Sequence, residues 1–211
     1  MKSKTNTLRE LFPQKQIPLI LNAILKAGNR LKKQSTTTGE ENEDSLTRRL
    51  HAYLIMDDLF RNGPLSIQLQ PEIPPSNNNS SYGKIDLLVP SNSGYQVYFA
   101  IEAKRLRYKS PKGTLVAGNS QYINEGMMRF VTEQYGPYVQ DGAMLGYVFD
   151  KNIAQAIRGI NSCIIGKAKE LKIKPPKKLK GSQIVPQAKI YETNHDLQGE
   201  LFNIYHIFLS I

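Results

Sequence analysis

Hydrophobic positions recur along the chain with two different periods, which predict a mixture of helices and strands. Spacings of three and four residues predict amphipathic helices at 17–33, 43–60, 118–135 and 152–170. Apolar runs and alternating patterns predict strands at 65–69, 85–89, 96–104, 142–150, 183–192 and 201–211. A helix between two of these strands indicates a βαβ crossover and mixed strand pairing. The predicted fold class is therefore α/β (α+β mixed), with a central mixed β-sheet flanked by helices.

The stretch 83–105 is the most informative part of the pattern, because it predicts two strands joined by a turn at 90–94. Side chains alternate across a strand, so Glu102 and Lys104 share one face of the second arm. The hairpin brings Asp86, in the first arm, back beside them. Two carboxylates and an ammonium are therefore expected to converge at one strand end.

Such a group suits a hard divalent cation, since Mg²⁺ takes oxygen ligands and is usually held by one or two carboxylates. A lysine beside the metal can orient a water or meet the charge that develops on a phosphate. A buried ion pair at the sheet edge, or two solvated charges, is the alternative interpretation. The apolar neighbours of these acids favour the functional one, because a lone carboxylate in an apolar strand is costly unless it is paired or binds metal.

The motif resembles the PD-(D/E)xK, or restriction-endonuclease-like, nuclease superfamily. Asp86 is followed by fifteen intervening residues and then by Glu102-Ala103-Lys104, although Ile85 stands where that superfamily usually has proline. The resemblance covers roughly residues 43–150 and implies a restriction-endonuclease-like core. It also implies Mg²⁺, with Mn²⁺ as a possible substitute, held by Asp86 and Glu102, with the carbonyl of Ala103 as a further ligand. Lys104 would help a water to attack phosphorus.

Two further residues are candidates through the same resemblance. An acid on the first core helix often joins the metal site in that superfamily, and Glu43 is the candidate, since Glu41 and Glu40 fall on other faces of the helix end. An acid that only complements the helix dipole is an equal alternative for Glu43. Gln121 matches the polar residue, commonly glutamine, on the helix after the ExK strand, and its alternative is an exposed helix residue.

Charge indicates the class of partner. The formal charge is +10, from 28 Lys and Arg against 18 Asp and Glu, which favours nucleic acid, with DNA as the expected substrate. Directly after the ExK strand comes a basic run that contains Tyr108, and a further cation lies on the next helix. A solvated loop is the alternative for such a run. The candidate nucleic-acid-binding residues are Arg105, Arg107, Lys109, Lys112 and Arg129.

The chain is predicted to be a single nuclease-like domain, 1–211. It comprises an N-terminal helical extension at 1–40, the core motif region at 43–150, and a C-terminal helix, lysine-rich segment and closing strands at 151–211. The single cysteine, Cys163, excludes an internal disulfide. The apolar run at 17–25 is too short to span a bilayer and lacks a cleavage pattern, so a cytoplasmic protein is expected.

The predicted function is that of a metal-dependent nuclease that hydrolyses phosphodiester bonds, in restriction or phage defence. The alternative is a catalytically inactive protein of the same fold that binds nucleic acid or a partner protein. The sequence leaves open a homodimer and a partner subunit such as a helicase or methyltransferase.

Overall fold

Among the described residues, a seven-stranded mixed sheet forms the centre of the fold, which confirms the predicted α/β class. The computed structural model describes residues 12–34, 41–73, 83–91, 94–135 and 139–211. The sheet order is β1 (Gln68–Leu69), β4 (Leu87–Ser91), β5 (Gly94–Leu106), β8 (Asp141–Val148), β11 (Glu200–Ser210), β10 (Ile190–Leu197) and β9 (Lys180–Gly181). Pairing is parallel from β5 to β8 and from β8 to β11, and antiparallel elsewhere, so the expected mixed pairing is present.

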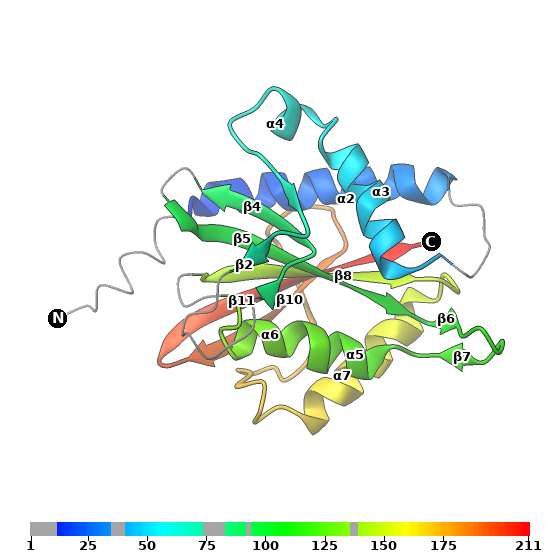
Figure 1. Ribbon diagram of the computed structural model, residues 1–211. Coiled ribbons are helices and arrows are strands. Elements are labelled where there is room, and N and C mark those ends of the chain that lie inside the picture. The colour runs from blue at the N-terminus through cyan, green and yellow to red at the C-terminus, as the bar shows by residue number, and fades with distance from the viewer. Residues whose placement is uncertain (1–11, 35–40, 74–82, 92–93, 136–138) are drawn as a thin grey trace.

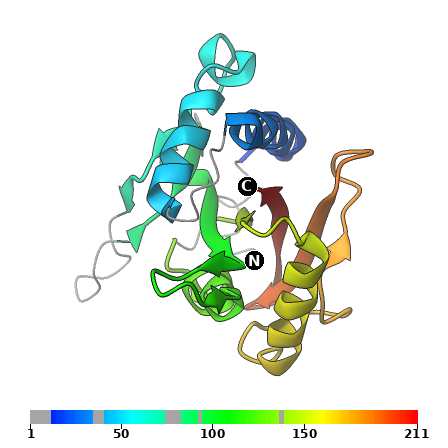
Figure 2. The same cartoon turned by 90° about the vertical axis from the view of Figure 1, so that its right-hand side faces the viewer.

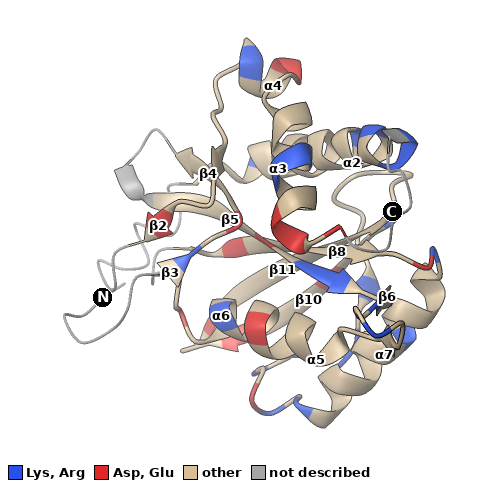
Figure 3. Ribbon diagram, turned by 45° about the vertical axis from the view of Figure 1, so that its right-hand side comes forward, with Lys and Arg blue, Asp and Glu red and all other residues tan. Residues whose placement is uncertain are grey.

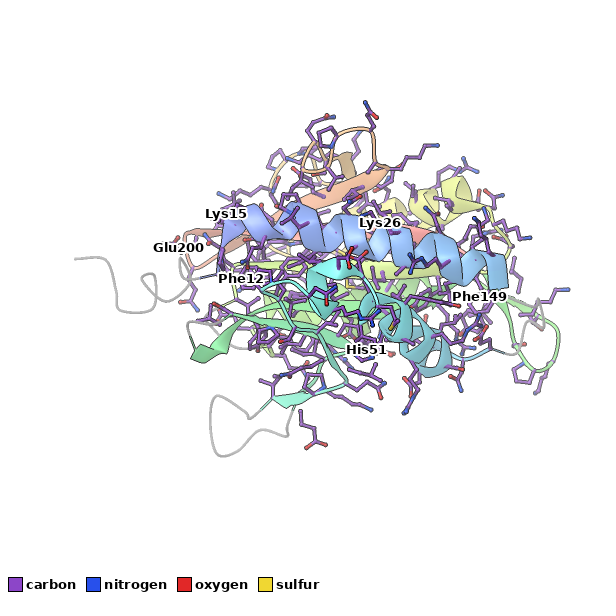
Figure 4. All side chains as sticks on the ribbon, turned by 90° about the horizontal axis from the view of Figure 1, so that it is seen from above. Phe12, Lys15, Lys26, His51, Phe149 and Glu200 are labelled. Carbon is purple, nitrogen blue, oxygen red and sulfur yellow. The ribbon has the colours of Figure 1, made fainter. Side chains whose placement is uncertain are left out.

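Helices cover both faces of this sheet, as Figures 1 and 2 show. One face carries α2 (Ile17–Gln34), which follows the short η1 (Gln14–Gln16), and α3 (Glu43–Leu54). Figure 4, from above, shows α2 running across the sheet. The other face carries α5 (Asn119–Tyr122), the π-helical η2 (Ile123–Met127), α6 (Met128–Val131) and α7 (Ile153–Gly166). In the part of the chain described, no helix is long and apolar enough to cross a membrane.

The alternation predicted for the central strand is confirmed. Phe99 and Ile101 of β5 belong to the core beneath α2 and α3. Tyr98 and Ala100 belong to the opposite core, beneath α5, α6 and α7. Because the period of a strand is two, Glu102 and Lys104 continue the second face towards the end of β5.

The helix predicted at 43–60 is interrupted after its first 12 residues. α3 ends at Leu54, and a separate short helix, α4 (Asp58–Arg61), begins after Asp57. The carboxylate of Asp57 accepts a hydrogen bond from the Leu59 backbone N–H at 3.1 Å. Asp57 is thus an N-cap, a role for which aspartate is strongly preferred, and it starts a new helix rather than continuing the apolar stripe.

The helix predicted at 118–135 is shorter and is not uniform. It ends at Val131, and residues 123–127 form a π-helical turn. Gly126 lies in that turn, where an added Cβ would stand 2.3 Å from Cε of Met144 on β8. The absence of a side chain therefore lets this turn approach the sheet closely, beside the strand end that carries Lys104.

Several strand boundaries also differ from the prediction. The closing strand expected at 183–192 begins only at Ile190, and the strand expected at 65–69 is reduced to β1. Two small hairpins were not predicted: β2 (Glu72–Ile73) with β3 (Gly83–Lys84), and β6 (Tyr108–Lys109) with β7 (Leu115–Val116). The second of these turns the basic run after β5 into an ordered arm, which projects from the sheet in Figure 1.

The lysine-rich segment after α7 is held along the edge of the sheet. The Lys174 N–H donates to the carbonyl of Asn194 and the Asp196 N–H donates to the carbonyl of Lys172, both at 2.8 Å. Ile173, between the two lysines, forms an isolated bridge with His195 of β10. The segment is therefore not a free linker at residues 172–174.

A buried hydrogen-bond chain runs from α5 across β11 and β10 to the segment after α7, on one face of the sheet. Nδ1 of His195 lies 2.7 Å from the carbonyl of Leu171, so this nitrogen carries a proton and Nε2 accepts from the Thr193 hydroxyl. Thr193 in turn accepts from Nε2 of His206, whose Nδ1 accepts from the Tyr122 hydroxyl at 2.9 Å. Both histidines are fully buried, and burial lowers the pKa of each, so they are neutral core residues whose ring nitrogens are all hydrogen-bonded.

Candidate active site

The candidate site forms where β5 extends beyond the end of its neighbouring strand, β4. The last pair between β4 and β5 is Leu87 with Ile101, yet β5 continues to Leu106. The next two N–H groups on that side of β5 belong to Ala103 and Arg105. They donate to Oδ2 of Asp86 at 2.8 Å and to Oε2 of Glu43 at 2.9 Å. These two carboxylates accept the hydrogen bonds that a neighbouring strand would otherwise accept, since buried backbone donors need acceptors.

The ammonium group of Lys104 is surrounded by oxygen atoms. Its Nζ lies 2.7 Å from the carbonyl oxygen of Ala103, 2.8 Å from Oε1 of Glu102 and 3.1 Å from Oε1 of Glu43. The Lys104 side chain is 8% exposed, and that of Glu43 is 28% exposed. Residues 61 positions apart in the sequence therefore meet around one cation, at the first turn of α3 and the end of β5. Figure 3 shows this acidic turn of α3 beside the basic strand end.

Glu102 is completely buried and has a donor on each oxygen. Oε1 accepts from Arg129 at 2.7 Å as well as from Lys104, and Oε2 accepts from the hydroxyl of Tyr135. Arg129 was predicted to contact nucleic acid, but the structure places its guanidinium on Glu102. Tyr135 was not singled out at all, because no residue spacing links the end of a helix to a strand 33 positions earlier.

Burial and charge shift the protonation equilibria of the site. Burial, reinforced by the neighbouring Glu102, raises the pKa of Asp86 from 3.8 to about 7. Burial also raises the pKa of Glu102, and the cations of Lys104 and Arg129 oppose that rise. For Lys104, burial favours the neutral amine, but the carboxylates around it outweigh burial and raise the pKa. Lys104 is therefore charged at neutral pH, while Asp86 is poised between its two forms.

An open pocket of about 370 Å³ is lined by two members of this cluster, Glu43 and Lys104, whereas Asp86 and the fully buried Glu102 do not line it. Its lining comes from the start of α3, the end of β5 with Lys104, the β6–β7 arm and α5 with η2. Such a volume is in the range of small-molecule sites. The pocket is lined by Asn42, Glu43, Asp44, Lys104, Arg105, Tyr108, Gln121 and Glu125.

The remaining predicted catalytic candidates are distributed around this pocket. Gln121 is exposed and lines the wall, without a hydrogen bond to the cluster among the described residues. Of the three helix-end acids, Glu43 reaches Lys104, whereas Glu41 pairs with Arg49 at 2.5 Å. Glu40 lies outside the described residues.

The basic residues after the ExK strand divide into two kinds. The guanidinium of Arg105 lies 4.1 Å from the ring centre of Tyr108, at the pocket wall. Lys109 and Lys112 are exposed on the β6–β7 arm. Arg107 instead forms an ion pair with Asp150 at 2.6 Å, so its charge is compensated within the protein.

The oxygen donors at this site suit Mg²⁺ chemically, since carboxylates and a backbone carbonyl are hard ligands. As the side chains stand, no group of three or more His, Cys, Asp or Glu among the residues described could hold a metal ion. The oxygens of Glu102, Ala103 and Glu43 accept hydrogen bonds from Lys104, and those of Glu102 also accept from Arg129 and Tyr135. The donor types fit the metal, and the present arrangement is the one that holds Lys104.

Comparisons with known proteins give no match: no family model fits the chain, and no curated protein or solved structure is significantly similar to it.

Proposed function

We propose that this protein is a Mg²⁺-dependent nuclease that hydrolyses phosphodiester bonds of DNA, with a restriction-endonuclease-like core. The observation that carries the proposal is the meeting of Asp86, Glu102 and Lys104 at the unpaired end of β5, beside an open pocket. A perturbed carboxyl and a buried cation in a cleft are typical of a functional site. The proposed setting is the cytoplasm, in restriction or phage defence.

Asp86, Glu102 and the carbonyl of Ala103 are the groups that would hold the metal. When bound, a divalent cation supplies a Lewis acid for phosphate oxygens and lowers the pKa of a water. The protein's own contribution is to fix these oxygens. Asp86 is held by the Ala103 N–H, and Glu102 is held by Arg129 and Tyr135.

The groups at the pocket supply charge and a surface for the substrate. Lys104 lines the pocket, where its ammonium can donate to a phosphate oxygen as negative charge develops. Arg105 and Tyr108 form a stacked pair at the wall, and an aromatic face can receive a nucleobase. The exposed lysines of the β6–β7 arm would contact the sugar-phosphate backbone, which positions a substrate without reading its sequence.

A second candidate function is binding without hydrolysis. The observation in its favour is that both oxygens of Glu102 already have cationic or hydroxyl donors within the protein. A buried ion pair of this kind can be purely structural. Under this alternative, the basic arm would bind nucleic acid while the cluster only fixes the end of β5.

Cleavage assays separate the two functions. Purified protein is incubated with single-stranded, double-stranded and branched DNA and RNA, with Mg²⁺, Mn²⁺ or EDTA. We expect cleavage of DNA that requires the metal and that Asp86→Asn, Glu102→Gln and Lys104→Ala each abolish. Salt-dependent binding with no cleavage of any substrate would favour the second function. Cleavage that survives all three changes in a pure preparation would contradict the proposal.

A matched control is available in Asp141, a buried aspartate at the start of β8. Its carboxylate accepts from Gln14 and Asn203 at 2.8 and 2.9 Å. On β8 it lies five positions before Gly146, the partner of Lys104, which corresponds to roughly 16 Å along the strand. Asp141→Asn should change stability and leave metal-dependent cleavage by the folded protein intact.

A further inference from the structure

We infer that the exposed side of α7 and the lysine-rich segment after it form a surface, separate from the pocket, that binds the phosphate backbone of nucleic acid. Positive charge is concentrated in this part of the chain. Residues 151–180 contain nine Lys and Arg against one Glu, a net charge of +8 out of the chain's +10. Such a local excess favours a polyanionic partner, because each phosphate that a cation neutralises releases counterions. The inference concerns binding and does not depend on hydrolysis at the candidate active site.

Most of these cations have no acidic partner within the protein. Three lysines of the stretch form ion pairs, with Glu170, Asp196 and Glu192. The other six cations are exposed and form no ion pair among the described residues, so their charge is available to a partner. We call these six residues the basic surface: Lys151, Arg158, Lys169, Lys172, Lys177 and Lys178.

The lysine-rich segment is anchored to the fold, which directs its cations outwards. Leu171, Ile173 and Leu179 are buried in the core that α7 covers, whereas Lys172, between the first two, is exposed. The Leu179 N–H also donates to Oδ1 of Asn161 on α7 at 2.8 Å. Because these contacts fix the backbone in the free protein, less conformational entropy is lost when a partner binds.

The basic surface begins beside the β6–β7 arm. Arg107, just before the arm, pairs with Asp150, and the ring of Tyr108 lies 6.3 Å from that of Phe149, so the arm contacts the residues that lead into α7. Figure 1 shows α7 starting near this arm and running away from it. The 14 residues of α7 span about 21 Å, a length over which a duplex carries about a dozen phosphate charges. A duplex that touches the arm can therefore continue along α7.

Nucleic acid fits this surface better than a membrane does. A helix that binds a bilayer inserts an apolar face among the headgroups. The apolar residues Ala156, Ile160 and Ile164 of α7 are buried in the protein core, so they are not available for insertion. Ile165 is exposed, but a single apolar side chain on a surface is common. A line of exposed cations instead matches the regular charge of a phosphate backbone, which such cations contact without reading the base sequence.

The test is the binding of a labelled DNA duplex to the full chain, measured by fluorescence anisotropy in EDTA over a range of salt concentrations. Replacing four lysines of the basic surface with glutamine should reduce the slope of log affinity against log salt by about 3 to 4, since each phosphate contact contributes ~0.9. The matched control replaces four exposed cations of α2, on the opposite face of the sheet, and should change the slope by less than about 1. The test variant carries Lys169→Gln, Lys172→Gln, Lys177→Gln and Lys178→Gln, and the control carries Lys26→Gln, Arg30→Gln, Lys32→Gln and Lys33→Gln.

The two variants lose the same amount of charge, so their comparison separates the basic surface from net charge. A test variant with the wild-type slope would overturn the inference, and so would an equal reduction in both variants. A test variant that keeps its affinity for nucleic acid but no longer binds phosphatidylserine vesicles or polyglutamate would show that the partner class is wrong. A reduced slope with duplex DNA or with duplex RNA of the same length supports the inference and identifies the source of the phosphate backbone. Any of these failures leaves the proposed cleavage standing, because neither variant changes the candidate active site.

A second measurement uses the wild type alone and does not depend on the folding of a variant. Acetylation by an amine-reactive reagent, followed by mass spectrometry, reports the access to each lysine with and without saturating DNA. We expect DNA to slow acetylation several-fold at the lysines of the basic surface and to leave Lys26, Lys32 and Lys33 of α2 unaffected. Unchanged acetylation of the basic surface while DNA is bound would overturn the inference.

Discussion

Asp86 should destabilise the protein when no metal is bound, so replacing it with asparagine should stabilise the fold. The folded protein raises the pKa of this carboxyl from 3.8 to about 7. The folded state therefore binds the proton more tightly than the unfolded state does. By linkage, stability falls as pH rises from about 4 to about 7, and the full penalty applies above that window.

The magnitude follows from the same shift. A difference of about three pKa units corresponds to at most ~4 kcal/mol, a large part of the free energy of unfolding of an ordinary domain. Asp86→Asn removes the charge and keeps the shape and an oxygen that can accept from the Ala103 N–H. Above pH 7 the variant should recover most of the penalty, and below pH 4 it should equal the wild type.

Urea denaturation in EDTA at pH 4.5 and pH 8 measures this difference. Asp86→Ala is the control, because it removes the charge together with the acceptor for Ala103. Asp86→Ala should show the same pH-dependent gain in the free energy of unfolding, but its stability should be lower by about 1 kcal/mol at both pH values because the hydrogen bond is lost. If the stability difference between Asp86→Asn and the wild type were the same at both pH values, the electrostatic account of the site would be wrong.

Three further predictions concern the rest of the molecule. Burial lowers the pKa of His195 to about 4 and that of His206 well below its usual 6.5, so these residues contribute stability above pH 6.5 that is lost as pH falls towards 4. Replacing either histidine with glutamine should reduce the loss of unfolding free energy between pH 6.5 and pH 4, measured by urea denaturation. Gly118 has φ +74°, and a Cβ there would lie 2.2 Å from a β5 carbonyl oxygen, so Gly118→Ala should lower the free energy of unfolding by at least ~1 kcal/mol and reduce activity. Lys109→Gln with Lys112→Gln should reduce the slope of log affinity for DNA against log salt by about 2, measured by fluorescence anisotropy, and an unchanged slope would exclude these lysines from the phosphate contacts.

The sequence predicts those parts of the site that depend on the strand period and on one turn. Alternation in 96–104 places Glu102 and Lys104 on one face, and the structure shows them bonded to each other. The hairpin returns Asp86 to the same strand, where it accepts from Ala103. These relations depend on the two-residue period and on a single turn, so neighbouring residues determine them.

The remaining contacts of the site were not predictable in the same way. Glu43 meets Lys104 only because α3 packs with its first turn at the end of β5. Arg129 and Tyr135 reach Glu102 across 27 and 33 positions, after a helix that contains a π-helical turn. A π-helical turn has one more residue than an α-helical turn, so it changes the direction in which later side chains point. The α-helical spacing used to predict faces from the sequence does not include this change.

The sequence by itself determined the class of fold, the face of each strand that carries the acids and the amine, and the positive charge of the whole chain, because these follow from composition and from the intrinsic periods of helices and strands. Only the tertiary structure decided that β4 stops short of the end of β5 and that two carboxylates accept the N–H groups left there. It also decided that the Lys104 ammonium lies among the oxygens of Glu102, Ala103 and Glu43. Those features arise from the packing of segments far apart in the chain, where the cost of leaving a buried donor or charge without a partner selects the arrangement.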